Sequence, residues 1–437
     1  MTNSTIIVNK QLPVSILLSL TLITSFSMVT IIIPNILVYI FLFATVCLGY
    51  LYLLKFYKFV DRRLIKFLIF FLIPSILGLI SYFIGYYFES DIFNYDELNP
   101  FGRIFNIFLM FSFIIILHSY SIYNNHFKVF NWYRFGVFIL LITAVWQTIS
   151  VYTGIIPFPF ETRAHLHSTY GNEFSFSHRI TGIAAEPSYF TMFTIDFIVL
   201  SLLLYVGKKR FFYVALALLL MILSLSPSGY LTLIFTFIAA YIFTNLIKIK
   251  KRIDLKKIFV MIISLVFTIV IIYILFKYNI LDYIILRITN PEMLQSARVY
   301  MSYMPFVWAS DSNIFSFLFG HGIKSYSIIG TSFNVPDGIP VHITSNNIYV
   351  DIFWESGFVG LLTLFSFFMY CFIKILKSPF SKLQIFISFF ILFDLMFSGI
   401  FRADFASIRF FILLYLLYVL INYDFFNKGK ICQKFQF

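Results

Sequence analysis

Long apolar segments recur along almost the whole chain and are separated by connections that are mostly short and polar. A helix that crosses a membrane needs about 20 mostly apolar residues, and we assign twelve such segments. They cover residues 13–33, 35–54, 64–87, 103–122, 132–155, 187–207, 211–226, 228–247, 258–277, 347–375, 383–400 and 408–425. Only the connections 156–186 and 278–346 are long. The pattern predicts an all-α, polytopic membrane protein with about 12 transmembrane helices, in which residues 1–437 form a single integral membrane domain with two large loops.

The lysine and arginine residues are distributed unevenly among the connections. Most of the 32 lie before the first segment or on alternate connections, with clusters at 55–66, 208–210, 248–257 and 374–382. Cytoplasmic loops of membrane proteins carry an excess of Lys and Arg. The distribution therefore predicts that both termini are cytoplasmic and that both large loops are on the outer face, where we expect the chemistry.

The composition agrees with a membrane protein and excludes several other classes. Hydrophobic residues make up 60% of the chain and charged residues 12%, with a mean hydropathy of +0.92. A soluble globular protein has about a quarter charged residues, so a cytosolic enzyme, a secreted disulfide scaffold and a disordered chain are excluded. In a soluble protein the net charge of +13 would suggest nucleic acid as a partner. Here the cytoplasmic connections account for it, and we expect no nucleic-acid partner.

Ionisable residues gather where the first large loop meets the sixth predicted span. Residues 161–189 contain Arg163, Arg179, three histidines, and Glu186 followed by Pro187. Proline suits the first turn of a helix, and an acidic residue favours its positive end. Because an arginine is always charged and binds phosphate through paired hydrogen bonds, the two arginines suit a pyrophosphate ligand. The alternative is that they only anchor the loop at the membrane interface and that Glu186 only marks the helix start.

We expect neither a metal ion nor a cofactor. The loop histidines His165, His167 and His178 have no further ligand that would fix a metal geometry. The chain also contains no Asp-x-Asp motif, which a transferase using a nucleotide-sugar and a divalent cation would usually need.

The second large loop contains Arg298 and His342 and leads into the tenth predicted span. There Asn347, Asp351 and Glu355 recur every four residues and so share one face of a helix. Glu355 lies about two turns below the outer surface, where a carboxylate is costly unless an arginine pairs with it. Such a pair could lock the helix or serve a substrate, and both readings stay open. We expect the following Gly357 and Gly360 to permit close helix packing.

Two acidic residues lie inside predicted spans. Asp196 and Asp394 have no basic partner within their own segments, and paired acids in a membrane can form the proton relay of a transporter. Arg402 and Arg409 add two guanidinium groups that we expect on the outer side, where they could bind phosphate or anchor the surface.

At these segments the chain resembles the O-antigen polymerase (Wzy) family, within the O-antigen polymerase and ligase superfamily. The matching pieces lie in the same order as in that family, and the plan of apolar segments matches over nearly the whole chain. They are Arg179-x-x-Gly182 with Glu186-Pro187-Ser188, the turn Ser226-Pro-Ser228-Gly229-Tyr230, Arg298 ahead of Gly320-x-Gly322, and Asn347-x-Tyr349 with Glu355-x-Gly357-x-x-Gly360.

The resemblance implies a metal-independent glycosyltransferase of lipopolysaccharide or other surface polysaccharide biosynthesis in the bacterial inner membrane. Its donor and acceptor would be oligosaccharides linked to undecaprenyl diphosphate, joined at the periplasmic face, with a chain-length regulator protein as a further partner. The family's two functional arginines correspond to Arg179 and Arg298, which would stabilise the leaving diphosphate with help from Arg163 or Arg402. Glu186 is the first candidate for the general base and His342 the second. Asn347, Tyr349 and Glu355 would contribute to substrate binding.

Two other functions stay open. A ligase would usually have a His-Asn pair nine residues before the glutamate of the tenth span, where this chain has Asn346-Asn347 with His342 out of register. A flippase for lipid-linked oligosaccharides, which is a transporter, would show two similar halves and short outer loops. The chain shows neither, so we favour the polymerase.

Overall fold

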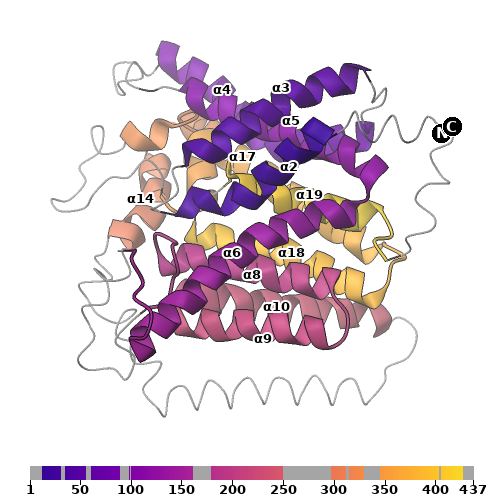
Figure 1. The fold of residues 1–437 in the computed structure, drawn as a ribbon. Coiled ribbons are helices and arrows are strands. Elements are labelled where there is room, and N and C mark those ends of the chain that lie inside the picture. Colours follow the sequence, from indigo (N-terminus) through magenta and orange to yellow (C-terminus); the bar gives the residue numbers. More distant parts are fainter. Residues whose placement is uncertain are drawn as a thin grey trace.

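The computed structural model describes residues 12–30, 35–55, 61–88, 98, 100–160, 179–249, 297–311, 314–328, 345–402 and 405–426. In these ranges every regular element is a helix (Figure 1). The helices are α2 (Leu12–Thr24), η1 (Ser25–Val29), α3 (Ile36–Lys55), α4 (Arg62–Phe88), α5 (Pro100–Asn124), α6 (His126–Thr153), α8 (Pro187–Leu204), α9 (Lys208–Leu223), α10 (Pro227–Ile249), α14 (Ala297–Asp311), α15 (Ile314–Phe319), η3 (Ser325–Ile328), α17 (Ile348–Leu376), α18 (Lys382–Phe401) and α19 (Ile408–Asn422).

Eight of the described helices are long and apolar enough to cross a membrane, namely α3, α4, α5, α6, α8, α10, α17 and α18. Large apolar side chains cover their outward faces, and Ile40, Phe108 and Phe365 are each about half exposed. An apolar surface on this scale would be unfavourable in water and is typical of a lipid-facing surface. The protein is therefore an all-helical, multi-pass membrane protein.

Eleven of the twelve predicted spans coincide with a described helix, and the ninth, 258–277, lies outside the described residues. The first span is broken, because α2 ends at Thr24 and continues as the short 3₁₀ helix η1. The number of spans thus stays a prediction. The segment 278–346 differs from the expectation of a plain loop, since it contains α14, α15 and η3.

The centre of the bundle is formed by α8, α18 and α19. Every residue of α19 from Ile408 to Ile421 is buried, and most of α8 and α18 is buried as well. Around this centre, α17 packs against α4, and α10 packs against α18. In Figure 1, α9 and α10 lie along one side of the molecule, and α3 and α4 lie along the opposite side.

The connections between helices gather at two ends of the bundle. At the end where α3, α5, α8, α10, α17 and α19 begin, contacts join Asn106 to Ala406, Arg179 to Leu225 and Tyr189 to Arg402. We call this the loop end. The opposite end, where α4, α6, α9 and α18 begin, carries the basic clusters 62–66, 208–210 and 374–382, and we call it the basic end.

An arginine joins the two acidic residues in the centre of the bundle. The guanidinium group of Arg409 donates two hydrogen bonds to Asp196, at 2.8 and 2.9 Å, and one to Asp394, at 2.8 Å. The hydroxyl of Tyr133 donates to the same Asp196 carboxylate, and Arg409 is 2% exposed. The alternative that Arg409 anchors the protein at the surface is therefore wrong. Its charge lies inside the protein because two carboxylates from α8 and α18 balance it.

Candidate functional site

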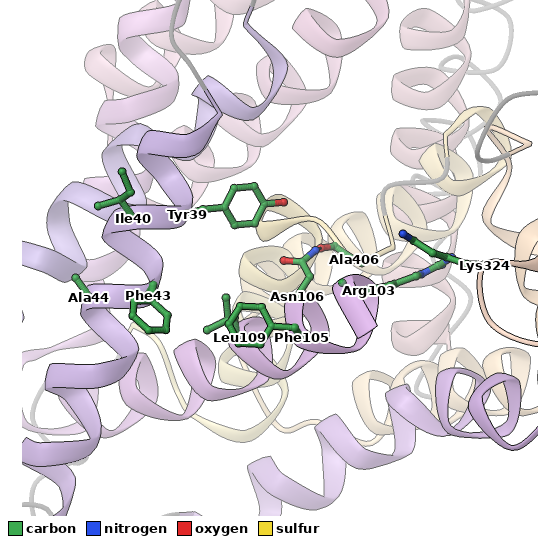
Figure 2. A pocket seen from close by; sticks show the side chains of 11 residues that line it. Tyr39, Ile40, Phe43, Ala44, Arg103, Phe105, Asn106, Leu109, Lys324 and Ala406 are labelled. Atoms are coloured by element: carbon green, nitrogen blue, oxygen red, sulfur yellow. The ribbon is translucent and has the colours of Figure 1, made fainter. Parts of the chain in front are cut away.

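A groove of about 860 Å³ lies between α3 and α5 at the loop end (Figure 2). Apolar and aromatic side chains form most of it. The lining residues are Tyr39, Ile40, Phe43, Ala44, Gly102, Arg103, Phe105, Asn106, Leu109, Lys324 and Ala406. Ile40, Phe43 and Phe105 are each slightly more than half exposed. Since they belong to the lipid-facing surface, the groove opens sideways toward the membrane interior.

Two cationic side chains, Arg103 and Lys324, lie at one end of this groove (Figure 2). Arg103 is in the first turn of α5 and forms an ion pair with Glu355 of α17. The backbone amide of Lys324 donates to the same Glu355 carboxylate at 3.0 Å. Glu355 is 6% exposed, so these contacts satisfy a carboxylate that would otherwise be buried at high cost. The pairing of Glu355 with an arginine is thereby confirmed.

A break in α17 positions the turn that carries Lys324. Gly357 has φ 67° and ψ −169° inside the helix, which interrupts the helical hydrogen bonds on either side. The carbonyl oxygens of Trp354 and Glu355 instead accept hydrogen bonds from the amides of His321 and Gly322, at 2.8 and 3.0 Å. The turn therefore joins α17 as an additional hydrogen-bonded segment.

The same turn is also held by α4. The amide of Ile323 donates to the carbonyl oxygen of Gly78 at 2.8 Å, and a Cβ at Gly322 would lie 2.4 Å from Cα of Tyr82. Lys324 itself adopts φ 66°, a left-handed conformation that is uncommon for a residue other than glycine. Strained residues of this kind persist where the surrounding structure determines them, and they cluster at functional sites.

Charged side chains are concentrated at this end of the groove. Arg103 and Lys324 line it beside an apolar surface, and Glu355 contacts the Arg103 side chain and the Lys324 backbone. A ligand that matches this arrangement has an anionic group at one end and a long apolar chain at the other. Arginine and lysine are the usual partners of phosphate groups, so a lipid phosphate or diphosphate fits the groove.

A second group of predicted site residues meets at the start of α8. Glu186 accepts a hydrogen bond from the hydroxyl of Ser188 at 3.2 Å, and the guanidinium carbon of Arg402 lies 3.7 Å from the ring centroid of Tyr189. This geometry is a cation–π contact. Next to it is a cavity of about 10 Å³, about the room that one water molecule needs, lined by Ser188, Thr191, Met192, Ile195, Ser228, Gly229, Thr232, Ser398, Phe401 and Arg402.

Arg179 is anchored to the connection between α9 and α10. Its guanidinium group donates to the carbonyl oxygens of Ser224 and Leu225, at 3.4 and 3.0 Å. Ser228 and Gly229, in the first turn of α10 that follows this connection, line the small cavity beside Arg402. The structure thus brings Arg179 and Glu186 to the loop end together with Arg402, as the sequence predicts.

Other predicted site residues serve the helices themselves. The Asn347 side chain accepts hydrogen bonds from the amides of Tyr349 and Val350 and caps the start of α17. The Tyr349 hydroxyl donates to the carbonyl oxygen of Met396 at 2.7 Å, which joins α17 to α18. Arg298 belongs to the first turn of α14, but its side chain lies outside the described residues, as do Arg163 and His342.

The sequence did contain a signal for Arg103 and Lys324, although neither was predicted as a site residue. Both belong to the few basic residues that do not follow the alternating pattern of the connections. Membrane topology does not explain the position of a basic residue that departs from this pattern. In the structure, both residues line the groove and contact Glu355.

Comparison of the chain with protein families finds no family model that matches it, and comparison with characterised protein sequences finds no match. The fold and the two groups of residues at the loop end therefore have to support any function on their own.

Proposed function

We propose that the protein is a glycosyltransferase of the bacterial inner membrane that polymerises oligosaccharide repeat units linked to undecaprenyl diphosphate. The observation that carries the proposal is the apolar groove between α3 and α5, which ends at Arg103 and Lys324. A polyprenyl chain suits the groove, and a diphosphate suits the two cationic side chains that line its end. On this proposal the loop end is periplasmic, the basic end is cytoplasmic, and the resemblance supports the same orientation.

The proposed reaction transfers a glycan from one lipid carrier to another. A hydroxyl of the acceptor repeat unit attacks the anomeric carbon of the donor glycan, the bond to undecaprenyl diphosphate breaks, and the diphosphate leaves with the electron pair. Arg103 and Lys324 are placed to stabilise this leaving group, and Arg179 and Arg298 keep the same role that the resemblance implies. The acceptor hydroxyl gives its proton to a base, with Glu186 as the first candidate and His342 as the second.

Two sites are needed because both substrates carry a lipid. The connection between α18 and α19 contributes to both groups at the loop end: Arg402 lines the small cavity at α8, and Ala406, four residues later, lines the groove. Asn106 fixes this connection, since its amide donates to the carbonyl oxygen of Ala406 at 2.9 Å. We propose that the donor carrier occupies the groove, that the acceptor sugar reaches Glu186 beside α8, and that Arg163 or Arg402 assists in stabilising the leaving diphosphate. A chain-length regulator protein would then act on the loop end.

The experiment is a deletion strain complemented with single variants and examined by polysaccharide electrophoresis. We expect Arg103→Ala, Arg179→Ala and Arg298→Ala to leave only one repeat unit on the lipid acceptor. Lys209→Ala, at the basic end, is the matched control and should give the normal ladder of chain lengths. A normal ladder in all three arginine variants would exclude the proposal. An unmodified core in the deletion strain would indicate a ligase or, if repeat units gather on the cytoplasmic face, a flippase.

A further inference from the structure

A second cavity, of about 540 Å³, lies at the basic end of the bundle. It is formed where α17 ends, where α19 ends, and along the connection that leads to α18. The lining residues are Tyr370, Ile373, Lys374, Lys377, Ser378, Pro379, Phe380, Ile421 and Asn422. None of them belongs to the groove or to the residues at the start of α8, so the cavity needs an explanation of its own.

The described lining combines positive charge with an apolar wall. It includes Lys374 and Lys377 and no acidic residue. The ammonium group of Lys374 lies 5.6 Å from the ring centroid of Tyr370, so its side chain folds along the wall of the cavity. The same lining also contains Ile373 and Phe380. This combination attracts an anion that has an apolar part.

An exposed apolar stripe of α17 leads to the cavity. Leu362, Phe365, Met369 and Ile373 are 48%, 43%, 57% and 41% exposed. Their spacing of three and four residues places them on one face of the helix. From Leu362 to Ile373 the helix rises about 16 Å, which is about half of the 30 Å hydrocarbon core of a bilayer. The stripe therefore has the length of one acyl chain in one leaflet.

We propose that this cavity binds the headgroup of an anionic phospholipid, with the acyl chain lying along the α17 stripe. The two lysines supply the charge complementarity, and the apolar stripe distinguishes a membrane lipid from a soluble anion. Basic cavities between transmembrane helices are a known way to bind anionic headgroups. This site does not depend on the proposed function, because it lies at the opposite end of the bundle from the groove.

The test is native mass spectrometry of the full-length protein, stripped of lipid in detergent and titrated with phosphatidylglycerol or phosphatidylcholine. We expect one phosphatidylglycerol to bind in preference to phosphatidylcholine. Lys374→Gln combined with Lys377→Gln should weaken its binding about 30-fold, since each basic residue near a lipid headgroup contributes about fivefold. Lys208→Gln combined with Lys209→Gln, at the same end of the bundle but away from the cavity, should have no such effect.

Three results would overturn the proposal. They are equal binding of the two lipids, an equal loss in the control variant, and competition by glycerol phosphate at the concentration at which the lipid itself binds. If the double variant does not fold, the single variants Lys374→Gln and Lys377→Gln take its place, each with an expected weakening of about fivefold. Unchanged binding in both single variants would likewise overturn it.

Discussion

Arg103 and Glu355, which are 252 residues apart in the chain, form an ion pair at the loop end of the bundle. The pair joins the first turn of α5 to the part of α17 where the helix is broken at Gly357. The amide of Lys324 donates to the same carboxylate oxygen of Glu355. One carboxylate thereby positions both cationic residues at the end of the groove, so the stability of this region and its capacity to bind an anion depend on the same contacts.

Arg103→Ala should lower the free energy of unfolding by about 3 kcal/mol, because it leaves the buried Glu355 carboxylate without its guanidinium partner. Adding Glu355→Gln should recover most of this loss, since the unpaired charge is then removed. Polymer synthesis should stay absent in the double variant, because the cation is still missing. The measurement is unfolding in detergent, followed by electrophoresis of the glycan product. A double variant as unstable as Arg103→Ala would contradict this account of Glu355.

Arg409→Met should be more damaging than the loss of any surface arginine. The substitution leaves Asp196 and Asp394 buried without the cation that both contact, and we expect a loss of about 3–5 kcal/mol. Tyr133→Phe removes one hydrogen bond to Asp196 and should cost about 1 kcal/mol. Unfolding of both variants in detergent gives the comparison. A stable Arg409→Met protein would mean that the carboxylates find other partners or are protonated.

Gly357→Ala should disrupt the turn that carries Lys324. A Cβ at Gly357 would lie 2.3 Å from the carbonyl group of Leu318, and the residue has φ 67°. Gly102→Ala is the matched control, because a Cβ there meets nothing within 4 Å. We expect loss of folded protein only in the Gly357 variant, measured as monodisperse yield and thermal unfolding. Equal behaviour of the two alanine variants would show that the break in α17 tolerates a side chain.

Much of the fold follows from local patterns in the sequence. The helices α3, α4, α5 and α17 lie within a few residues of the predicted spans. The reason is that the backbone N–H and C=O groups of an apolar segment in a membrane find hydrogen-bond partners within the segment only if it is a helix. In contrast, α14 was missed. It contains Pro305 and is too short and polar to span a membrane, so hydropathy alone gives no signal for it.

The sequence predicted which type of partner a buried charged side chain needs, but not which residue supplies it. Burial requires that Glu355 pair with a cation, yet its identity as Arg103 depends on how α5 packs near α17. Arg409 was expected on the outer side, where it could bind phosphate or anchor the surface. Its burial depends on acidic residues from two other helices, α8 and α18. No local sequence pattern predicts that these three helices pack together.

Ala44→Trp should block the groove without unfolding the protein. Ala44 lines the groove, so the larger ring would occupy the space that we assign to a polyprenyl chain. Ile69→Trp is the matched control, since Ile69 is 46% exposed on α4 and does not line the groove. We expect about tenfold weaker binding of a polyprenyl phosphate to the Ala44 variant, measured by native mass spectrometry, and no change in the control. Unchanged binding in both variants would exclude this groove as the binding site of the polyprenyl chain.

Asp61, at the basic end, should make the free energy of unfolding depend on pH in the acidic range. Burial by itself raises the pKa of Asp61, but hydrogen bonds from His118, Tyr418, Tyr423 and the Arg63 amide outweigh it and hold the pKa well below its usual value. The two tyrosine hydroxyls lie 2.7 and 3.0 Å from the carboxylate.

A group whose pKa is lowered by folding contributes stability above its unfolded pKa, about 3.9 for Asp, and loses it as the pH falls toward the folded value. We therefore expect the free energy of unfolding to hold down to about pH 4 and to decline below it. Asp61→Asn should be less stable at pH 7 and should lack this part of the acid dependence, whereas Asp424→Asn should retain it. Denaturant titrations in detergent between about pH 3 and 7 measure the difference. Parallel curves for the wild type and Asp61→Asn would show that these hydrogen bonds to Asp61 contribute nothing to stability.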